Sequence, residues 1–130
     1  MDIFRDMHKM HAKFKIHEAV DKMDKETLKK FMKFRLDFLM EELNETRMAY
    51  CRGDAEEVVD GLIDLIVVAA GTLDLFKVDS KKAWREVLKA NLSKKPGVKK
   101  GRPNPLGLPD LMKPEGWVAP SHKGNTGILP

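Results

Sequence analysis

Carboxylate side chains gather on both sides of a short break in the sequence, and they are the residues best suited to do chemistry. Two of them precede the break at residues 52–54 and three follow it: Glu42, Glu45, Glu57, Asp60 and Asp64. Because they are spaced three or four residues apart, the members of each group share one face of a helix. The same helices are apolar on other faces, so we expect part of this charge near a core, where crowded carboxylates resist ionisation. A bound divalent cation relieves such repulsion, and the two groups therefore predict a Mg²⁺ site and phosphate chemistry.

The two acidic groups can form one site if the helices that carry them pack against each other. A tight turn at Gly53 makes these helices antiparallel neighbours and places the two groups within about one helical turn of each other. Four or five carboxylates that converge there form a cage of oxygen ligands, which suits Mg²⁺ completed by water and substrate phosphates. Two such ions can hold the attacking and leaving oxygens of an in-line displacement. The spacing alone leaves open a simpler alternative, in which the acids are solvated and pair with Lys or Arg.

Hydrophobic periodicity predicts the helices that would position these acids. We expect a short amphipathic helix over residues 2–12, a long helix from an Asp24 N-cap to Tyr50, and further helices over 55–76 and 80–92. Residues 13–23 are ambiguous. In the long helix, apolar residues recur with the period of a core-facing stripe: Leu28, Phe31, Met32, Leu36, Leu39 and Leu43. The pattern predicts an all-α bundle of four to five helices.

The helix over 55–76 has features that predict close packing. Residues 65–70 are apolar on nearly every face, which places them in the middle of a bundle or in a subunit interface. Gly61 and Gly71 lower helix propensity and make sense where another helix or a ligand approaches closely. In the last helix we expect Trp84, Val87 and Leu88 to point inward.

The character of the chain changes after the last predicted helix. All seven prolines and six of the nine glycines lie in residues 96–130, a density that excludes regular structure. We therefore divide the chain into a helical domain, 1–93, and a C-terminal tail, 94–130, that wraps the bundle or is mobile. The tail holds seven Lys or Arg and two Asp or Glu, whereas residues 1–93 hold 17 and 18. A basic tail suits a polyanion, either nucleic acid or the phosphates of a nucleotide.

Features of the composition bear on the cellular compartment in which we expect the protein. Cys51 is the only cysteine, so no internal disulfide can form and a reducing compartment fits. The N-terminus carries scattered charges and no continuous apolar stretch, which is not the pattern of a secretory signal. The longest apolar run is too short to cross a bilayer. We expect a cytoplasmic protein without a membrane partner.

Four segments in order carry a resemblance to a known family. Residues 39–45 followed by 57–60 resemble the ExxE…ExxD signature of the all-α NTP pyrophosphohydrolase superfamily. Residues 60–71 are similar to its Asp-x-Leu-x-Asp-x-x-x-Val-x-x-Gly helix. Residues 87–94 and 113–117 resemble the Val-x-x-x-Asn-x-x-Lys and Lys-Pro-x-Gly-aromatic segments of its MazG-like branch. The short chain and its Gly/Pro-rich tail are similar to phage-type members of that branch.

The resemblance implies a helical homodimer or homotetramer that hydrolyses a (deoxy)nucleoside triphosphate to the monophosphate and pyrophosphate. It implies Mg²⁺, with Mn²⁺ as a substitute, held by Glu42, Glu45, Glu57 and Asp60, with Asp64 as a further or indirect ligand. Glu42 or Glu45 would also orient or deprotonate the attacking water. The nucleotide would contact Asn91 and Lys94, and in the tail Lys113 and Trp117.

Several alternatives stay open at this stage. Trp117 would either stack on a base or anchor the tail, and Lys99, Lys100, Arg102 and Lys113 would either hold phosphates or be solvated. We expect His8, His11 and His17 mostly at the surface because their spacing is irregular. The alternative functions are a phosphoribosyl-ATP pyrophosphohydrolase and a non-enzymatic nucleic-acid-binding protein. Nucleic acid is not the expected partner, because only Trp117 accompanies the tail's basic residues and the acids would have no role.

Overall fold

The structure is a computed structural model that describes residues 1–101 and 104–130, and its described helices confirm the all-α fold. Five helices are present: α1 (Ile3–Lys13), α2 (Ile16–Asp21), α3 (Lys25–Cys51), α4 (Ala55–Leu75) and α5 (Ser80–Leu92). Two short strands follow, β1 (Lys95–Gly97) and β2 (Asp110–Met112). The chain forms two compact units, one of residues 1–80 with 126–130 and one of residues 81–125. The division predicted from composition, 1–93 and 94–130, stays a prediction.

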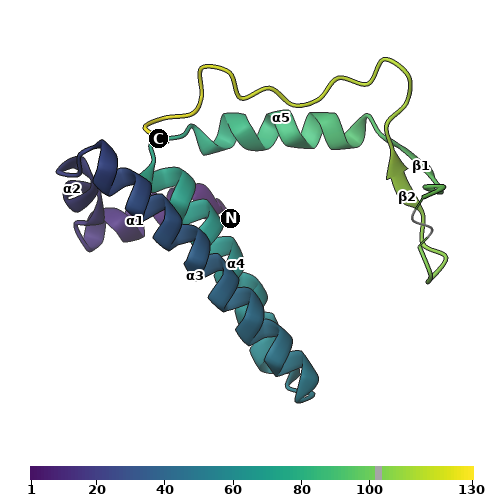
Figure 1. The fold of residues 1–130 in the computed structure, drawn as a ribbon, viewed down its shortest axis with the longest axis horizontal. Helices are drawn as coiled ribbons and strands as arrows, with labels where there is room; N and C mark the ends of the chain where they lie inside the picture. Colours follow the sequence, from purple (N-terminus) through teal and green to yellow (C-terminus); the bar gives the residue numbers. More distant parts are fainter. Residues whose placement is uncertain (102–103) are drawn as a thin grey trace. The chain divides into compact units, whose positions relative to one another are not determined.

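The first unit is built on a hairpin of the two long helices, α3 and α4, which lie side by side in Figure 1. Asp24 caps α3 by accepting a hydrogen bond from the backbone N–H of Thr27, and Asp54 caps α4 in the same way from Glu57. Gly53 between them has a φ of 73°, the left-handed conformation that glycine adopts most readily. The short break at residues 52–54 therefore reverses the chain as expected.

The two glycines of α4 lie where neighbouring helices come closest. A Cβ on Gly61 would collide with Thr46 of α3, and one on Gly71 would lie 3.1 Å from Cε1 of His11 in α1. These contacts confirm that each glycine permits a close helix approach. Farther along the hairpin, Arg35 of α3 donates to the Thr72 hydroxyl and to the Val68 carbonyl, both at 2.9 Å.

Most of the buried core of the first unit lies at the end of the hairpin remote from Gly53, and Ala49 is buried near the turn. Phe76 is fully buried and its ring stacks on Phe31 at a centroid distance of 5.6 Å. Val20 of α2 is buried as well. The C-terminus also belongs here, because the N–H of Ile128 donates to the Phe76 carbonyl at 2.8 Å. The last residues of the tail are thus attached to the end of α4.

The apolar faces near the middle of the hairpin are exposed. Four exposed apolar residues form one stripe along α4: Val59, Leu62, Ile63 and Ile66. Three more form a matching stripe along α3: Leu36, Met40 and Leu43. The expected core stripe of α3 is therefore only partly covered within one chain. No helix among the described residues is long and apolar enough to span a membrane.

The second unit consists of α5, apart from its first residue, and the segment up to Asn125. The expectation that prolines and glycines exclude regular structure from this segment is wrong, because β1 and β2 pair antiparallel with Pro96 opposite Leu111. Proline is tolerated since each strand of a two-stranded sheet is an edge. Gly97 leaves room for the Met112 side chain, since a Cβ there would lie 2.7 Å from Cγ of Met112 and that side chain would have to shift.

The prediction of which residues of α5 point inward is also wrong. Trp84, Val87 and Leu88 are exposed, with Trp84 at 59 %. The later segment covers a different face of α5, where the Trp117 indole N–H donates to the Ala90 carbonyl at 2.8 Å. Figure 1 shows this segment running along α5. Helical spacing identified an apolar face, but it could not identify which face the tail would cover.

Candidate metal and nucleotide site

The packing of α3 on α4 determines which carboxylates lie opposite each other. The contact between Thr46 and Gly61 aligns the two helices. One helical turn from this contact, in the direction away from Gly53, lie Glu42 on α3 and Asp64 on α4. The Arg35–Thr72 hydrogen bond lies equally far from this contact along both helices, so it agrees with the same alignment. Glu42 and Asp64 are therefore level across the hairpin.

The electrostatics of Glu42 agree with this alignment. Partial burial, followed by the negative charges of Asp64, Glu45, Glu41 and Asp60, raises the pKa of the Glu42 carboxyl above its ordinary value. Glu42 and Asp64 are half-buried, whereas Glu45 and Asp60 are exposed. These charges place four of the predicted ligands near one another, although no three of their carboxylates have oxygen atoms within 4.8 Å of one another. We call these four residues the acidic group: Glu42, Glu45, Asp60 and Asp64.

The acidic group is not neutralised by basic side chains. Within the described part of the chain, no Lys or Arg forms an ion pair with any of its four members; the Lys ion pairs there involve Glu26, Asp37 and Asp21. Glu45 and Asp60 are exposed, as the alternative of solvated acids expects, but the Lys or Arg partners that it also expects are not found among the described residues. A set of oxygen ligands with excess negative charge is the environment that Mg²⁺ prefers.

Glu57 lies apart from the centre of this group. It is in the first turn of α4, where its N–H donates to the Asp54 cap, and its side chain is exposed. It is seven residues from Asp64, or about 10 Å along the helix axis. Its charge is not among those that raise the pKa of Glu42. Its role as a metal ligand stays a prediction.

The predicted nucleotide contacts lie in the second unit. The Nζ atoms of Lys94 and Lys113 lie 5.4 and 5.1 Å from the centre of the Trp117 ring, a cation–π arrangement. Since Trp117 also donates to Ala90, it anchors the tail segment on α5, which was one of its two expected roles. Asn91 is exposed. Of the basic tail residues, Lys99 is half-buried, Lys100 and Lys113 are exposed, and Arg102 lies outside the described residues.

A cavity of about 390 Å³ adjoins this tryptophan within the second unit. Its lining combines α5 with the segment 114–120: Glu86 and Lys89 contribute from the helix, and Ser93 directly follows it. A volume of this size accommodates a small ligand. Trp117 supplies an aromatic face, which suits the base of a nucleotide, and Lys89 supplies a positive charge, which suits its phosphates.

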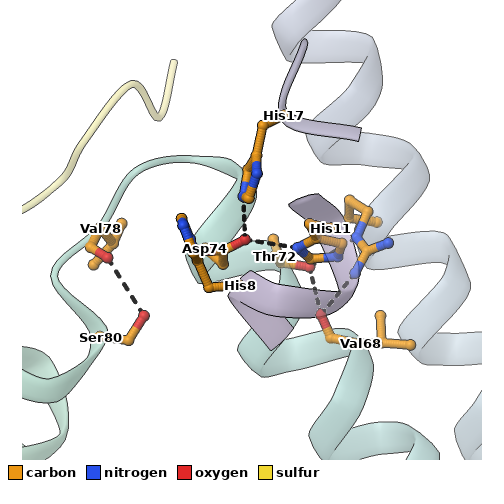
Figure 2. A network of polar contacts seen from close by, with 9 residues as sticks. His8, His11, His17, Val68, Thr72, Asp74, Val78 and Ser80 are labelled. Carbon is orange, nitrogen blue, oxygen red and sulfur yellow. Dashed lines mark hydrogen bonds and ion pairs between the residues drawn. The ribbon is translucent and has the colours of Figure 1, made fainter. Parts of the chain in front are cut away.

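Sequence reasoning missed a histidine cluster in the first unit, shown in Figure 2. His8, His11 and His17 all contact the Asp74 carboxylate, at 2.7, 2.6 and 2.7 Å. The expectation that these histidines are mostly at the surface is wrong for His11, which is 2 % exposed. The available signals were the three-residue spacing of His8 and His11 and the single acid near the end of an apolar helix.

The ionisation of Asp74 follows from its partners. Partial burial alone would raise its pKa, but hydrogen bonds from His11, His8 and His17 hold the pKa of Asp74 below its ordinary value. Asp74 is therefore a carboxylate at neutral pH. Its negative charge accepts from three imidazoles supplied by two helices.

Comparison with known families gives a match that covers the hairpin. The family model for phosphoribosyl-ATP pyrophosphohydrolase (PRA-PH) matches residues 7–91, which include every member of the acidic group. Lys94, Lys113 and Trp117 lie beyond the matched residues. A comparison with curated proteins gave no match. Since the match spans well over half of the chain, the protein belongs to the PRA-PH family, within the MazG-like all-α NTP pyrophosphohydrolase superfamily.

Proposed function

We propose that this protein is a Mg²⁺-dependent pyrophosphohydrolase that converts a (deoxy)nucleoside triphosphate to the monophosphate and pyrophosphate. The observation that carries the proposal is the level placement of Glu42 and Asp64, with Glu45 and Asp60 close enough to raise the pKa of Glu42. The family supports a hydrolase that cleaves pyrophosphate from a nucleotide-like substrate.

The donor set fits Mg²⁺, because all four members of the acidic group offer carboxylate oxygens and none has a Lys or Arg partner among the described residues. When bound, the ion would neutralise charge on the phosphate chain; Mn²⁺ offers similar chemistry. Glu42, Glu45, Asp60 and Asp64 would hold it, and Glu57 would join from the next turns of α4. Glu42 or Glu45 would also orient the attacking water and accept its proton.

Two sequence segments favour a nucleoside triphosphate as the substrate. Residues 87–94 and 113–117 resemble the MazG-like branch, and the short chain resembles its phage-type members. The second candidate is phosphoribosyl-ATP, which the description of the matching family names. Both substrates contain the same α–β phosphoanhydride, so the acidic group serves either one. We propose that Asn91, Lys94, Lys113 and Trp117 contact the nucleotide in the MazG-like manner.

A substrate panel separates these candidates. The eight common NTPs and dNTPs and phosphoribosyl-ATP would each be incubated with the protein and Mg²⁺, and pyrophosphate and orthophosphate would be quantified separately. We expect pyrophosphate, stoichiometric with monophosphate, from at least one triphosphate and not without a divalent ion. Turnover of phosphoribosyl-ATP alone would replace the first candidate by the second. Release of orthophosphate alone would contradict both.

We also propose that the protein is a homodimer or a pair of dimers. The support is the pair of exposed apolar stripes on α3 and α4, since a hairpin with two such stripes covers them by packing on another copy. Continuity with the acidic group favours this occupant, because the stripe residue Ile63 precedes Asp64 and Leu43 follows Glu42. Packing of a second hairpin there would also shield the acidic group from water.

A further inference from the structure

The histidine cluster lies outside the acidic group and has no role in the proposed hydrolysis. His8 and His11 come from α1, His17 from α2, and Asp74 from the last turn of α4. Figure 2 shows His11 and His17 directed at this carboxylate, and Nδ1 of His8 lies 2.7 Å from its Oδ1. Asp74 is ten residues beyond Asp64, or about 15 Å along the helix. The cluster is therefore a separate centre, and its nitrogen donors differ from the oxygen donors of the acidic group.

The local fold explains how three segments reach one point. His8 and His11 are three residues apart and share a face of α1. Lys15 adopts a left-handed conformation, with a φ of 57°, and turns the chain so that α2 brings His17 back to the same carboxylate. Gly71 lets α1 approach α4, since any side chain there would crowd His11. Asp74 follows one turn later on that face.

We propose that His8, His17 and Asp74 form a binding site for a divalent transition-metal ion of the Zn²⁺ type, with His11 positioning Asp74. Two imidazoles and one carboxylate are a donor set that such ions favour over Mg²⁺. One ring nitrogen each of His8 and His17 and a carboxylate oxygen of Asp74 lie within 4.8 Å of one another. Three protein ligands leave a fourth tetrahedral position for water.

The geometry needs only small side-chain shifts to accept an ion. Zn²⁺ bonds of about 2.0–2.2 Å separate tetrahedral ligand atoms by about 3.3 Å. Nδ1 of His8 now lies 2.7 Å from Oδ1 of Asp74 and Nε2 of His17 lies 2.7 Å from Oδ2, so both distances must open by roughly half an ångström around an ion bound to this carboxylate. The side chain of His8 is 67 % exposed, which gives it freedom to move and gives an ion access from solvent.

Protonation does not prevent binding. In the hydrogen-bonded form, Nδ1 of His8 and Nε2 of His17 each donate a proton to Asp74. A neutral imidazole can carry its proton on the other ring nitrogen, so both atoms become ligands without net loss of a proton. Asp74 is already ionised. The side chain of His11 is 3 % exposed, and its Nδ1 continues to donate to Asp74, as partners of metal-bound carboxylates do.

An ion at this place would connect α1 and α2 to α4. Because the unfolded chain does not hold the three ligands together, binding should stabilise the folded state. The test uses the full chain after treatment with a chelator and its removal. Zn²⁺ would be titrated by calorimetry, the thermal midpoint would be measured with and without Zn²⁺, and Co²⁺ would report nitrogen coordination through its visible absorption.

The variants are His8→Ala and His17→Ala, each with a native fold confirmed by circular dichroism. His122→Ala is the matched control, since His122 belongs to the second unit and not to the cluster. We expect one Zn²⁺ per chain, a higher thermal midpoint, and at least a tenfold loss of affinity in both cluster variants but not in H122A. Glu42→Gln should retain this binding, which separates it from the acidic group and from the proposed hydrolysis.

Two results would overturn the proposal. One is the absence of saturable Zn²⁺ binding to the wild-type chain. The other is equal affinity of the wild type and H8A, because His8 is exposed and its loss removes a ligand without removing core packing. Either result would leave the cluster as a hydrogen-bond network that holds α1 and α2 on α4.

Discussion

Glu42 is the residue at which the proposed function and the stability of the metal-free protein oppose each other. Its carboxyl lies among like charges that raise its pKa, and a group of this kind weakens folding once it is ionised. The folded state binds the proton more tightly than the unfolded chain. The penalty is therefore complete above the raised folded pKa and disappears as the pH falls below the unfolded value of about 4.5.

Glu42→Gln should therefore raise the thermal midpoint of the protein in buffer without divalent ions at pH 7, by about 1–3 °C. The advantage over the wild type should shrink as the pH is lowered toward 4.5, because wild-type Glu42 then becomes neutral. Thermal scans from pH 4.5 to 8 would measure it, with Glu18→Gln in α2 as the control. A difference that is independent of pH, or a lower midpoint for E42Q at pH 7, would contradict the origin assigned to the raised pKa.

Single substitutions of Asp64 and Glu57 locate the centre of the proposed metal site along α4. Asp64→Asn should reduce Mg²⁺-dependent pyrophosphate release by about 100-fold, since it removes a ligand level with Glu42. Glu57→Gln should cost less, because Glu57 lies about 10 Å farther along α4. Both rates would be compared at saturating Mg²⁺ and across a Mg²⁺ titration. If E57Q lost as much activity as D64N, the centre of the site would lie nearer to Gly53 than we infer.

At the scale of the helices, the site depends on the alignment that Gly61 and Thr46 impose on α3 and α4. A helical Gly→Ala change in open surroundings stabilises by about 1 kcal/mol. At Gly61 the new Cβ would meet the Thr46 side chain. Overpacking of this kind costs about 1–3 kcal/mol.

Gly61→Ala should accordingly destabilise the protein by up to about 2 kcal/mol in urea unfolding. Thr46→Ala in the same chain should recover part of the loss, because it removes the hydroxyl that the added methyl would strike. A double-mutant cycle gives the coupling directly. Additive effects of the two substitutions would show that the helices do not touch there and that the alignment of Glu42 with Asp64 is different.

Local signals predicted the helices well, and they failed where distant segments meet. Asp24, Gly53 and Asp54 each perform the capping or turning role that their residue type indicates. The β1–β2 pair was missed because residues 95–97 meet 110–112 only through tertiary pairing, which no local rule contains. The acids were identified from helical spacing, but their alignment across the hairpin depends on one close contact at Gly61.

The histidine cluster shows the same limit more sharply. The spacing of His8 and His11 places them on one helix face, but Asp74 is 66 residues from His8 in the chain, and no local pattern groups it with the histidines. Trp117 is an intermediate case. The sequence offered two roles for it; the hydrogen bond to Ala90 supports the anchoring role, and contact with a nucleotide stays a prediction.

At the scale of the whole molecule, the exposed stripes of α3 and α4 are the basis of the homo-oligomer that we propose. Ile63 is 53 % exposed and Met40 58 %, although both continue the apolar pattern of a buried helix face. Exposed apolar surface of this extent in a soluble protein marks an interface. We therefore expect a mass of twice or four times 14.8 kDa in solution.

Ile63→Glu should shift the protein toward a 14.8 kDa species in light scattering after gel filtration, because a buried charge in an interface is strongly unfavourable. Leu106→Glu makes the same change at an exposed leucine of the second unit and should leave the mass unchanged. If I63E and the wild type had the same mass at equal concentration, the stripe would not be the interface.

The central claim is that carboxylates from the two long helices share a divalent ion. The most direct measurement is the anomalous diffraction of Mn²⁺ in crystals soaked with that ion and a non-hydrolysable triphosphate. We predict a peak between Glu42 and Asp64, within bonding distance of carboxylate oxygens from both helices and of a phosphate oxygen. Well-ordered nucleotide with no peak there, and with the side chains of Glu42 and Asp64 turned to solvent, would contradict the account.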